Sequence, residues 1–436
     1  MNERQLIGAV GVAILFVLLA VRIPIGVAMA VVAIGGISAA VSVRAGFGVL
    51  SSIPFEVVGD WNLSAIPMFL LMGYVAAAAD LTKNLFKSAR ITLSWLPGGL
   101  ATATVISAAL FSSASGSSIA TAAVFARAVV PEMLKANYQP ALATGAVAAA
   151  GTLGALIPPS VLMIVYGITM STSINSLFLG GVVPGILTAF AFIVYITIRC
   201  ILNPSLAPTV VEAFSTEEKR EAFQDIWPLP VIIVCVIGGI FAGLFTPTEA
   251  GAVGATLAII VALLRRSLDR AKVTDALKKT AHGTATIFIV VVGAALFQRF
   301  LGLTGLASFF AELVAANIHT QIGLILAVAV LYLVLGCFLE PVSVMLLTLP
   351  ILAPVLTHFS VDLVWFGIIV IKLLEMGMVT PPLGLNIFVV KGALDNQVRL
   401  GEIFRGAGGF LIADCVTLGL IIAFPILSLW LPSMAR

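Results

Sequence analysis

A motif with a double proline occurs twice in this chain, and the two copies are 223 positions apart. The first copy is Gly151–Ser160 (GTLGALIPPS) and the second is Glu375–Asn386 (EMGMVTPPLGLN). The same shift relates Gly154 to Gly377. The chain is therefore predicted to contain two copies of one structural repeat, with an interruption inside an apolar segment of each copy. Interrupted helices at bilayer depth in both halves of a repeat indicate the binding site of a transporter.

The composition places these segments in a membrane. Hydrophobic residues make up 61% of the chain and charged residues only 10%, whereas a soluble domain is about 25% charged. Apolar stretches of about 18 residues or more recur from end to end, which predicts an all-α polytopic membrane protein. A β-barrel is not expected, because its strands alternate in segments of about ten residues.

Ten full crossings and two re-entrant hairpins are predicted. Each half contains five crossings, and five is odd, so the second half is expected to be inserted upside down as an inverted-topology repeat. The halves are 1–202 and 227–436, and a solvated cytoplasmic linker at 203–226 joins them. The predicted crossings are 7–20, 24–43, 63–80, 138–172, 176–199, 227–245, 247–265, 283–301, 361–391 and 407–432, and the hairpins are 99–134 and 321–357.

Two of these crossings, 138–172 and 361–391, are the broken helices. Segments 81–98 and about 302–319 are predicted to be amphipathic arm helices that lie along the membrane surface and brace a moving part. Most of the 23 Lys and Arg residues fall on one face of this topology. The positive-inside rule makes that face cytoplasmic, so both termini are predicted to be periplasmic.

The first hairpin turns at 112–118, where five of seven residues are serine (SSASGSS). Backbone without helical hydrogen bonds is tolerated at this depth only where protein or water satisfies it. The free carbonyl and hydroxyl oxygens of this turn are suitable ligands for a small hard cation. The free amides at the start of the second half-helix are suitable donors to an anion. The alternative is a stripe of small residues for tight packing. Candidate ligands here are Ser115, Gly116, Ser117 and Ser118 for Na⁺, and Ser113 and Ser115 for substrate.

The second hairpin turns at 336–341 (GCFLEP). Glu340 is either a carboxylate that caps the following half-helix or one linked to an ion or a gate. Consecutive prolines remove two helix donors and free the carbonyls one turn earlier, although a plain proline kink remains the alternative. With the two breaks, the predicted Na⁺ ligands also include Gly151, Thr152, Gly154, Pro158, Gly336, Glu340, Gly377, Thr380, Pro381 and Asn386.

Two sets of charged or polar residues lie inside apolar crossings. Arg299 follows Gln298, and an arginine at bilayer depth is a functional candidate by default. We predict that Arg299, with Gln298, binds a substrate carboxylate, while snorkelling to the interface or pairing with Glu340 remain open. Lys372 and Glu375 are three residues apart, which predicts a mutual salt bridge.

No enzyme signature is present: the chain has no Gly-x-Ser-x-Gly elbow and no P-loop. Its histidines are far apart in sequence, and no cofactor and no nucleic-acid partner are expected. Because no P-loop is present, an ion gradient is the expected energy source.

The combined motifs resemble those of a known family. Pro24–Gly26, 112–118, Gly151–Ser160, Phe245–Gly251 and Thr380–Asn386 are similar to the large membrane subunit of tripartite ATP-independent periplasmic (TRAP) transporters. The resemblance covers essentially the whole chain. It implies a Na⁺-coupled elevator-type importer of organic acids in the bacterial inner membrane. It also implies a small four-helix membrane subunit, here a separate chain, and a periplasmic substrate-binding protein.

The resemblance further implies where the ligands bind. One Na⁺ site would join 115–118 to 151–158, the other would join 336–341 to 377–381, and the substrate would lie between the two tips. The substrate itself is not fixed, since relatives import C4-dicarboxylates, sialic acid and other carboxylates. The main alternative is a stand-alone carboxylate carrier coupled to H⁺ or another anion, and a membrane-embedded enzyme or channel is a more distant one.

Overall fold

The computed structural model describes residues 2–208, 215–394 and 397–434, and within these ranges every regular element is helical. For residues 82–83, 221 and 223–225 only the backbone is described. Seven described helices are long and apolar enough to cross a membrane, or eight if a bent pair counts as one span. The prediction of an all-α polytopic membrane protein is therefore confirmed. The periplasmic placement of the chain ends stays a prediction, and residues 1 and 435–436 lie outside the described part.

The number of crossings differs from the ten expected, because some apolar runs are divided. Helices α2 (Ile25–Ala40) and α12 (Pro228–Phe241) have 16 and 14 residues. At 1.5 Å per residue they reach about 24 and 21 Å, less than the roughly 30 Å of a hydrocarbon core. Ser42 caps the next helix after α2, and Gly243 takes a left-handed conformation after α12. Conversely, α17 (Pro341–His358) is long enough to span, although we predicted it as half of a hairpin.

The helices repeat along the chain with the shift found in the motif. Helix α7 (Ser118–Lys135) and α17 begin and end 223 positions apart. The other pairs agree within a few residues, so the duplication extends to whole elements. They are α5 (Leu81–Leu93) and α15 (Leu306–Asn317), α6 (Gly99–Ser115) and α16 (Gln321–Gly336), α8 (Pro140–Leu156) and α18 (Leu363–Gly377), α9 (Val161–Thr169) and α19 (Leu385–Ala393), and α10 (Ile174–Leu202) and α20 (Leu400–Ala423).

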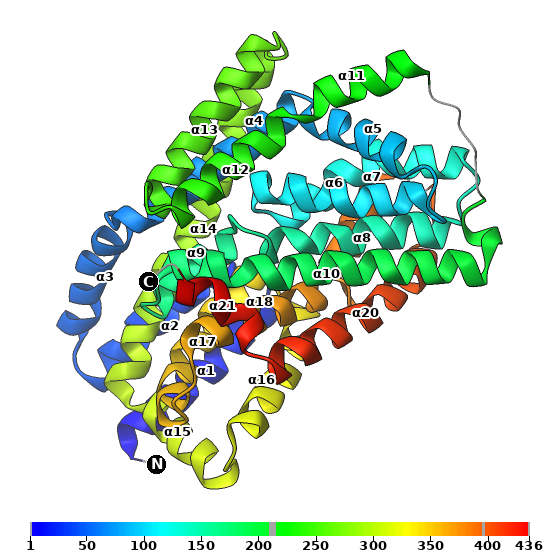
Figure 1. Cartoon of the computed structure of the whole chain (residues 1–436). Helices are drawn as coiled ribbons and strands as arrows, with labels where there is room; N and C mark the ends of the chain where they lie inside the picture. The colour runs from blue at the N-terminus through cyan, green and yellow to red at the C-terminus, as the bar shows by residue number, and fades with distance from the viewer. Residues whose placement is uncertain (1, 209–214, 395–396, 435–436) are drawn as a thin grey trace.

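The two halves differ before the arm helices. The second half has a single 35-residue helix, α14 (Arg270–Thr304), after α13 (Pro247–Leu264). The first half has α3 (Val43–Val58), the 3₁₀ turn η1 (Trp61–Ser64) and α4 (Ala65–Ala78) in its place. The Asp60 carboxylate accepts a hydrogen bond from the Asn62 amide, 2.8 Å away, and so starts the turn. Helix α3, which the sequence did not predict, lies at the edge of the molecule near the C-terminal half of α14 (Figure 1).

Helix α8 is the centre of a tightly packed bundle. It packs against α6, α7 and α20, and Figure 1 shows α6, α8 and α10 running side by side. Where α8 crosses α20, a Cβ placed on Gly406 would lie 1.8 Å from the Ala141 carbonyl oxygen. Small residues allow this backbone contact, as in other membrane helix pairs. Helices α1 (Glu3–Ala20), α2, α4 and α14 form a neighbouring group.

The arms contact the helix pairs next to them: α5 packs against α6, and α15 against α17. The segment predicted to be a solvated linker contains a helix, α11 (Thr216–Ile226), and this helix packs on α5. The Ser88 hydroxyl donates to the Ala222 carbonyl at 2.7 Å, and Ala222 is buried. Helix α11 therefore packs on α5 through Ala222, while residues 215–220 of the same stretch are exposed. Residues 209–214 of the predicted linker lie outside the described part.

Candidate transport site

The first tip joins α6 to α7 through two residues. Gly116 has φ +59, a conformation that glycine adopts without strain, and its amide donates to the Ser112 carbonyl at 2.8 Å. Ser117 then caps α7, since its hydroxyl accepts from the Ala120 amide at 3.3 Å. The Ser118 and Ile119 amides donate to no acceptor in the described part of the chain. The tip therefore presents two free amides at the positive end of α7.

This tip touches the first broken helix through its backbone. A Cβ on Gly154 would lie 3.2 Å from the Ser118 nitrogen, and one on Gly116 would lie 3.2 Å from the Pro159 carbonyl oxygen. The Ser118 hydroxyl donates to the Thr152 carbonyl at 3.4 Å. The predicted pairing of the tip with the Gly151–Pro158 segment is therefore present as direct contact.

The second tip touches the second broken helix at the equivalent place. A Cβ on Gly377 would lie 2.8 Å from the Gly336 Cα and carbonyl carbon. Glu340 is the N-cap of α17 and Pro341 its first residue, but the Glu340 side chain makes no capping bond. Its carboxylate accepts only a long bond, 3.5 Å, from the Ser343 hydroxyl. Glu340 therefore occupies the cap position, but its carboxylate does not bond to the amides at the start of α17.

Each break is followed by a buried side-chain oxygen without a partner. Helix α8 ends at Leu156 and α9 begins at Val161, with a bend of 40° between them. Ser160 Oγ and Asn386 Oδ1 are buried and have no hydrogen-bond partner among the described residues. Oxygen atoms of this kind are the ligands that small hard cations take. The residues present at the two breaks therefore fit a monovalent cation.

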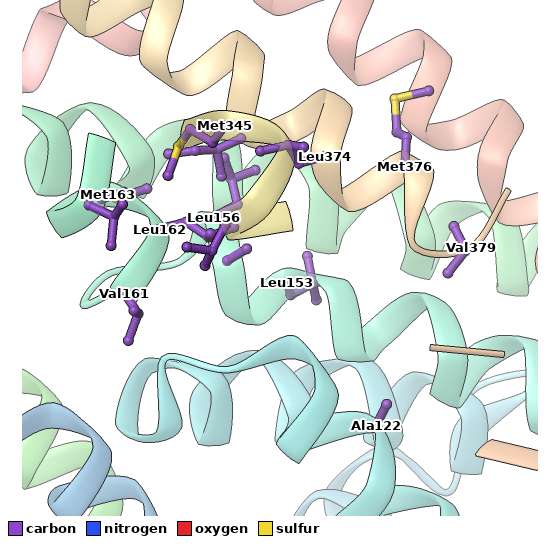
Figure 2. Packing of buried hydrophobic residues seen from close by; sticks show 14 of the residues in the cluster. Ala122, Leu153, Leu156, Val161, Leu162, Met163, Met345, Leu374, Met376 and Val379 are labelled. Atoms are coloured by element: carbon purple, nitrogen blue, oxygen red, sulfur yellow. The ribbon is translucent and has the colours of Figure 1, made fainter. Parts of the chain in front are cut away.

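Apolar packing fixes the position of the first break. Figure 2 shows side chains from the end of α8 and the start of α9 close to those of α17 and α18. All of these side chains belong to one buried hydrophobic cluster, so apolar packing surrounds the irregular backbone of the break. The residues are Leu153, Leu156, Val161, Leu162, Met163, Met345 and Leu374.

One small cavity of about 100 Å³ lies between the two tips. Gly116–Ile119 line it from the first tip and Glu340–Val342 from the second. Leu70 of α4 and Ile287 of α14 line it from the neighbouring group of helices. This volume is smaller than the roughly 300–1,000 Å³ of typical ligand pockets, and the cavity marks the place where the two tips face each other.

The structure does not bring Arg299 and Gln298 to this cavity. Both line a different cavity with Ile53 of α3, and both are exposed. Ile287 marks the level of the tips on α14, and Arg299 follows it by 12 residues, or about 18 Å along the helix axis. An arginine side chain does not span that length. The substrate role predicted for Arg299 and Gln298 has no support in this arrangement.

The predicted serine ligands divide into two groups. Ser117 and Ser118 line the cavity, whereas Ser113 and Ser115 are buried behind it. The Ser113 hydroxyl donates to the Ala109 carbonyl at 3.3 Å, and Ser115 Oγ lies 3.1 Å from Thr121 Oγ1. Neither side chain faces the space where a substrate would lie.

Sequence reasoning missed one partner in the charged cluster of α18. The predicted Lys372–Glu375 salt bridge is confirmed at 3.7 Å, but Lys372 Nζ lies only 2.5 Å from Asp414 Oδ1. Asp414 is on α20, so nothing in the local sequence indicates this pairing. The available signal was the depth of Asp414 within an apolar helix.

Comparison with known proteins identifies the family of this chain. Residues 12–427 match the family model described as "Tripartite ATP-independent periplasmic transporter, DctM component". The C4-dicarboxylate TRAP transporter large permease protein DctM of Pseudomonas aeruginosa is 33% identical over 87% of this chain and 88% of its own length. The sialic acid TRAP transporter large permease protein SiaM of Vibrio cholerae is 32% identical over 86% and 87%.

Similarity extends to a longer relative and to a solved transporter structure. The isethionate TRAP transporter permease protein DctMQ of Oleidesulfovibrio alaskensis is 31% identical over 87% of this chain, which spans 60% of that protein. The crystal structure of the YdaH transporter of Alcanivorax borkumensis has a TM-score of 0.61 at 13% identity, covering 89% of each chain, and shares the fold. The chain belongs to the DctM family, the large permease component of TRAP transporters, and is a multi-pass transporter permease, not an enzyme.

Proposed function

We propose that this chain is the large subunit of a Na⁺-coupled importer for an organic acid anion, working by an elevator-type movement. One observation carries the proposal. Gly154 and Gly377, which are equivalent positions of the two breaks under the 223-residue shift, each contact a tip, and both tips line one cavity. A duplicated arrangement of this kind provides two equivalent ion sites beside one substrate site.

The coupling ions are assigned to the two contacts between tip and break. One Na⁺ lies between 115–118 and 151–158, and the other between 336–341 and 377–381. The partnerless oxygens at Ser160 and Asn386 support this assignment, because a buried polar atom without a partner is costly and a bound cation would satisfy it. Na⁺ then supplies positive charge on both sides of the substrate.

The substrate carboxylate is assigned to the start of α7. The free amides of Ser118 and Ile119 lie at the positive end of that helix and line the cavity. Glu340 occupies the equivalent end of α17, so the second tip is the less favourable place for an anion. C4-dicarboxylate, sialic acid and isethionate, the compounds in the names of the relatives, are consistent with an anionic substrate.

An elevator movement is supported by a difference between the two breaks. Helix α9 packs against α4 and η1, whereas α19 packs against α7, α8 and α20. Correspondingly Pro158 and Pro159 are buried, while Pro381 and Pro382 are exposed. If the repeats 1–202 and 227–436 are inverted, sliding the tip and break helices past α4 and α14 would exchange which break is covered. That exchange is alternating access.

The partners follow from the family. We propose that a separate small four-helix membrane subunit and a periplasmic substrate-binding protein act with this chain in the bacterial inner membrane, with both termini periplasmic. The fused name DctMQ of one relative supports a membrane partner.

Uptake into proteoliposomes tests the coupling ion. With the chain and its partners reconstituted, an inward Na⁺ gradient is expected to drive substrate accumulation, and equimolar K⁺ is expected to reduce it to the rate of protein-free liposomes. The physical reason is that K⁺ is too large for a site built from closely packed backbone oxygens. Equal uptake in K⁺, or uptake that follows a pH gradient alone, would favour the stand-alone H⁺-coupled carrier.

A further inference from the structure

Three charged side chains form a closed cluster inside the bundle. Lys372 Nζ lies 2.5 Å from Asp414 Oδ1 and 3.7 Å from Glu375 Oε2, and each of the three residues is at most 1% exposed. Asp414 Oδ2 lacks a hydrogen-bond partner among the described residues, and the Glu375 oxygens have at most a weak contact with the Leu156 backbone. One ammonium group therefore faces two carboxylates that are incompletely satisfied.

The cluster exists in only one half of the repeat. The positions 223 residues before Lys372, Glu375 and Asp414 hold Ala149, Thr152 and Ala191. The bundle is duplicated in its helices and breaks but not in its buried charge. A purely structural ion pair would serve both halves equally, so the asymmetry calls for a separate explanation.

Charge counting gives the cluster a net charge of −1 when all three groups are ionised. The helices α8, α9, α16 and α21 (Ile426–Met434), which pack against α18 or lie beside it, contain no Asp, Glu, Lys or Arg. Helix α10 carries only Arg199, near its far end beside Tyr195, and α17 carries only His358 at its last residue. Helix α20 carries Glu402 and Arg405 as well as Asp414, and Arg405 precedes Asp414 by nine residues, or about 14 Å along the helix axis. A buried net charge without compensation is strongly unfavourable, so the cluster either holds a proton or has a positive species close by, and a bound cation would favour its ionised form.

The position of Glu375 shows where that species would lie. Glu375 is in the last turn of α18, two residues before Gly377, and its carboxylate lies beside the Leu156 backbone, two residues after Gly154. Gly154 and Gly377 are the two contacts with the tips. The negative cluster is thus placed between the two breaks, where the broken helices α8 and α18 meet.

We infer that Glu375, Lys372 and Asp414 form a single fixed counter-charge shared by both coupling cations. The inference rests on the proposed function, since it assigns a role to residues next to the proposed Na⁺ sites. A charge of −1 between two cations attracts each and offsets their mutual repulsion. Glu375 and Asp414 are positioning and electrostatic residues in this account, and neither is required as a direct ligand.

Charge-count variants test the inference. Glu375→Gln and Asp414→Asn each bring the cluster to zero, and each is expected to raise the Na⁺ concentration for half-maximal uptake about tenfold, the effect of a unit charge at roughly 10 Å in a protein interior. The double variant Lys372→Met with Asp414→Asn restores −1 and is expected to stay within about threefold of the wild type. Asp275→Asn, which changes an exposed carboxylate paired with Lys279, is the matched control.

A second readout separates charge from folding. Na⁺-dependent thermal stabilisation of the purified full-length chain, titrated against choline, should show the same order of half-saturating concentrations as uptake. If the double variant is worse than both single variants, the cluster is structural and the inference is overturned. Unchanged Na⁺ dependence in Glu375→Gln overturns it as well while the proposed function stands. A wild-type chain without any Na⁺ dependence overturns both.

Discussion

Replacing Gly377 by alanine is expected to reduce uptake by at least about 100-fold while the chain still folds. The added methyl group would lie 2.8 Å from two backbone atoms of Gly336, so no side-chain rotation relieves the clash. The second tip would have to move away from its break by a few tenths of an ångström to 1 Å. Displacements of about 1 Å in preorganised sites cost roughly 100-fold in rate. Proteoliposome uptake over a range of Na⁺ concentrations measures the effect.

The control for this variant is Gly392→Ala on α19, where the added methyl group meets nothing within 4 Å. It is expected to transport normally. The equivalent first-half variant, Gly154→Ala, meets its neighbours at 3.2 Å and is expected to have a smaller effect than Gly377→Ala. Normal uptake by Gly377→Ala would show that contact between the second tip and its break is not needed for transport.

Replacing Gly406 by alanine is expected to have the largest effect on stability. Its methyl group would lie 1.8 Å from the Ala141 carbonyl oxygen and 2.7 Å from the carbonyl carbon, so α8 and α20 would have to separate. Overpacking of this kind destabilises by about 3 kcal/mol. Thermal unfolding of the detergent-solubilised chain, followed by intrinsic fluorescence, is expected to shift to clearly lower temperature.

Gly408→Ala is the matched control, because Gly408 lies two residues further along α20 and an added methyl group there meets nothing within 4 Å. Its unfolding temperature is expected to equal that of the wild type within about one degree, as for other surface substitutions. If Gly406→Ala unfolds at the same temperature as Gly408→Ala, then the α8–α20 crossing is looser than its backbone contact indicates.

The broken helices were predictable because their signals are local. Two consecutive prolines cannot continue a helix, and α8 and α18 end at Leu156 and Gly377, within a few residues of them. Which tip pairs with which break was implied by the family resemblance. Family membership, and with it the transporter function, followed from the same motifs.

The features that the sequence did not reveal depend on tertiary placement. Helix α3 contains Pro54 and buries only Gly46, so its stretch carries no strong helical signal of its own. The distance of Arg299 from the cavity depends on the level along α14 at which the tips lie, and a single sequence gives no measure of that level. Pairing of Lys372 with Asp414 joins residues 42 positions apart on different helices. Packing of α11 on α5 similarly required the surface of α5 to be known.

Direct binding of radioactive Na⁺ to the purified chain tests the central claim, that each contact between tip and break holds one coupling cation. Equilibrium dialysis against choline medium is expected to give two Na⁺ per wild-type chain, and close to one for Gly377→Ala, whose first contact at Gly154 is intact. Absence of bound Na⁺ in the wild type, or two Na⁺ in Gly377→Ala, would contradict the account.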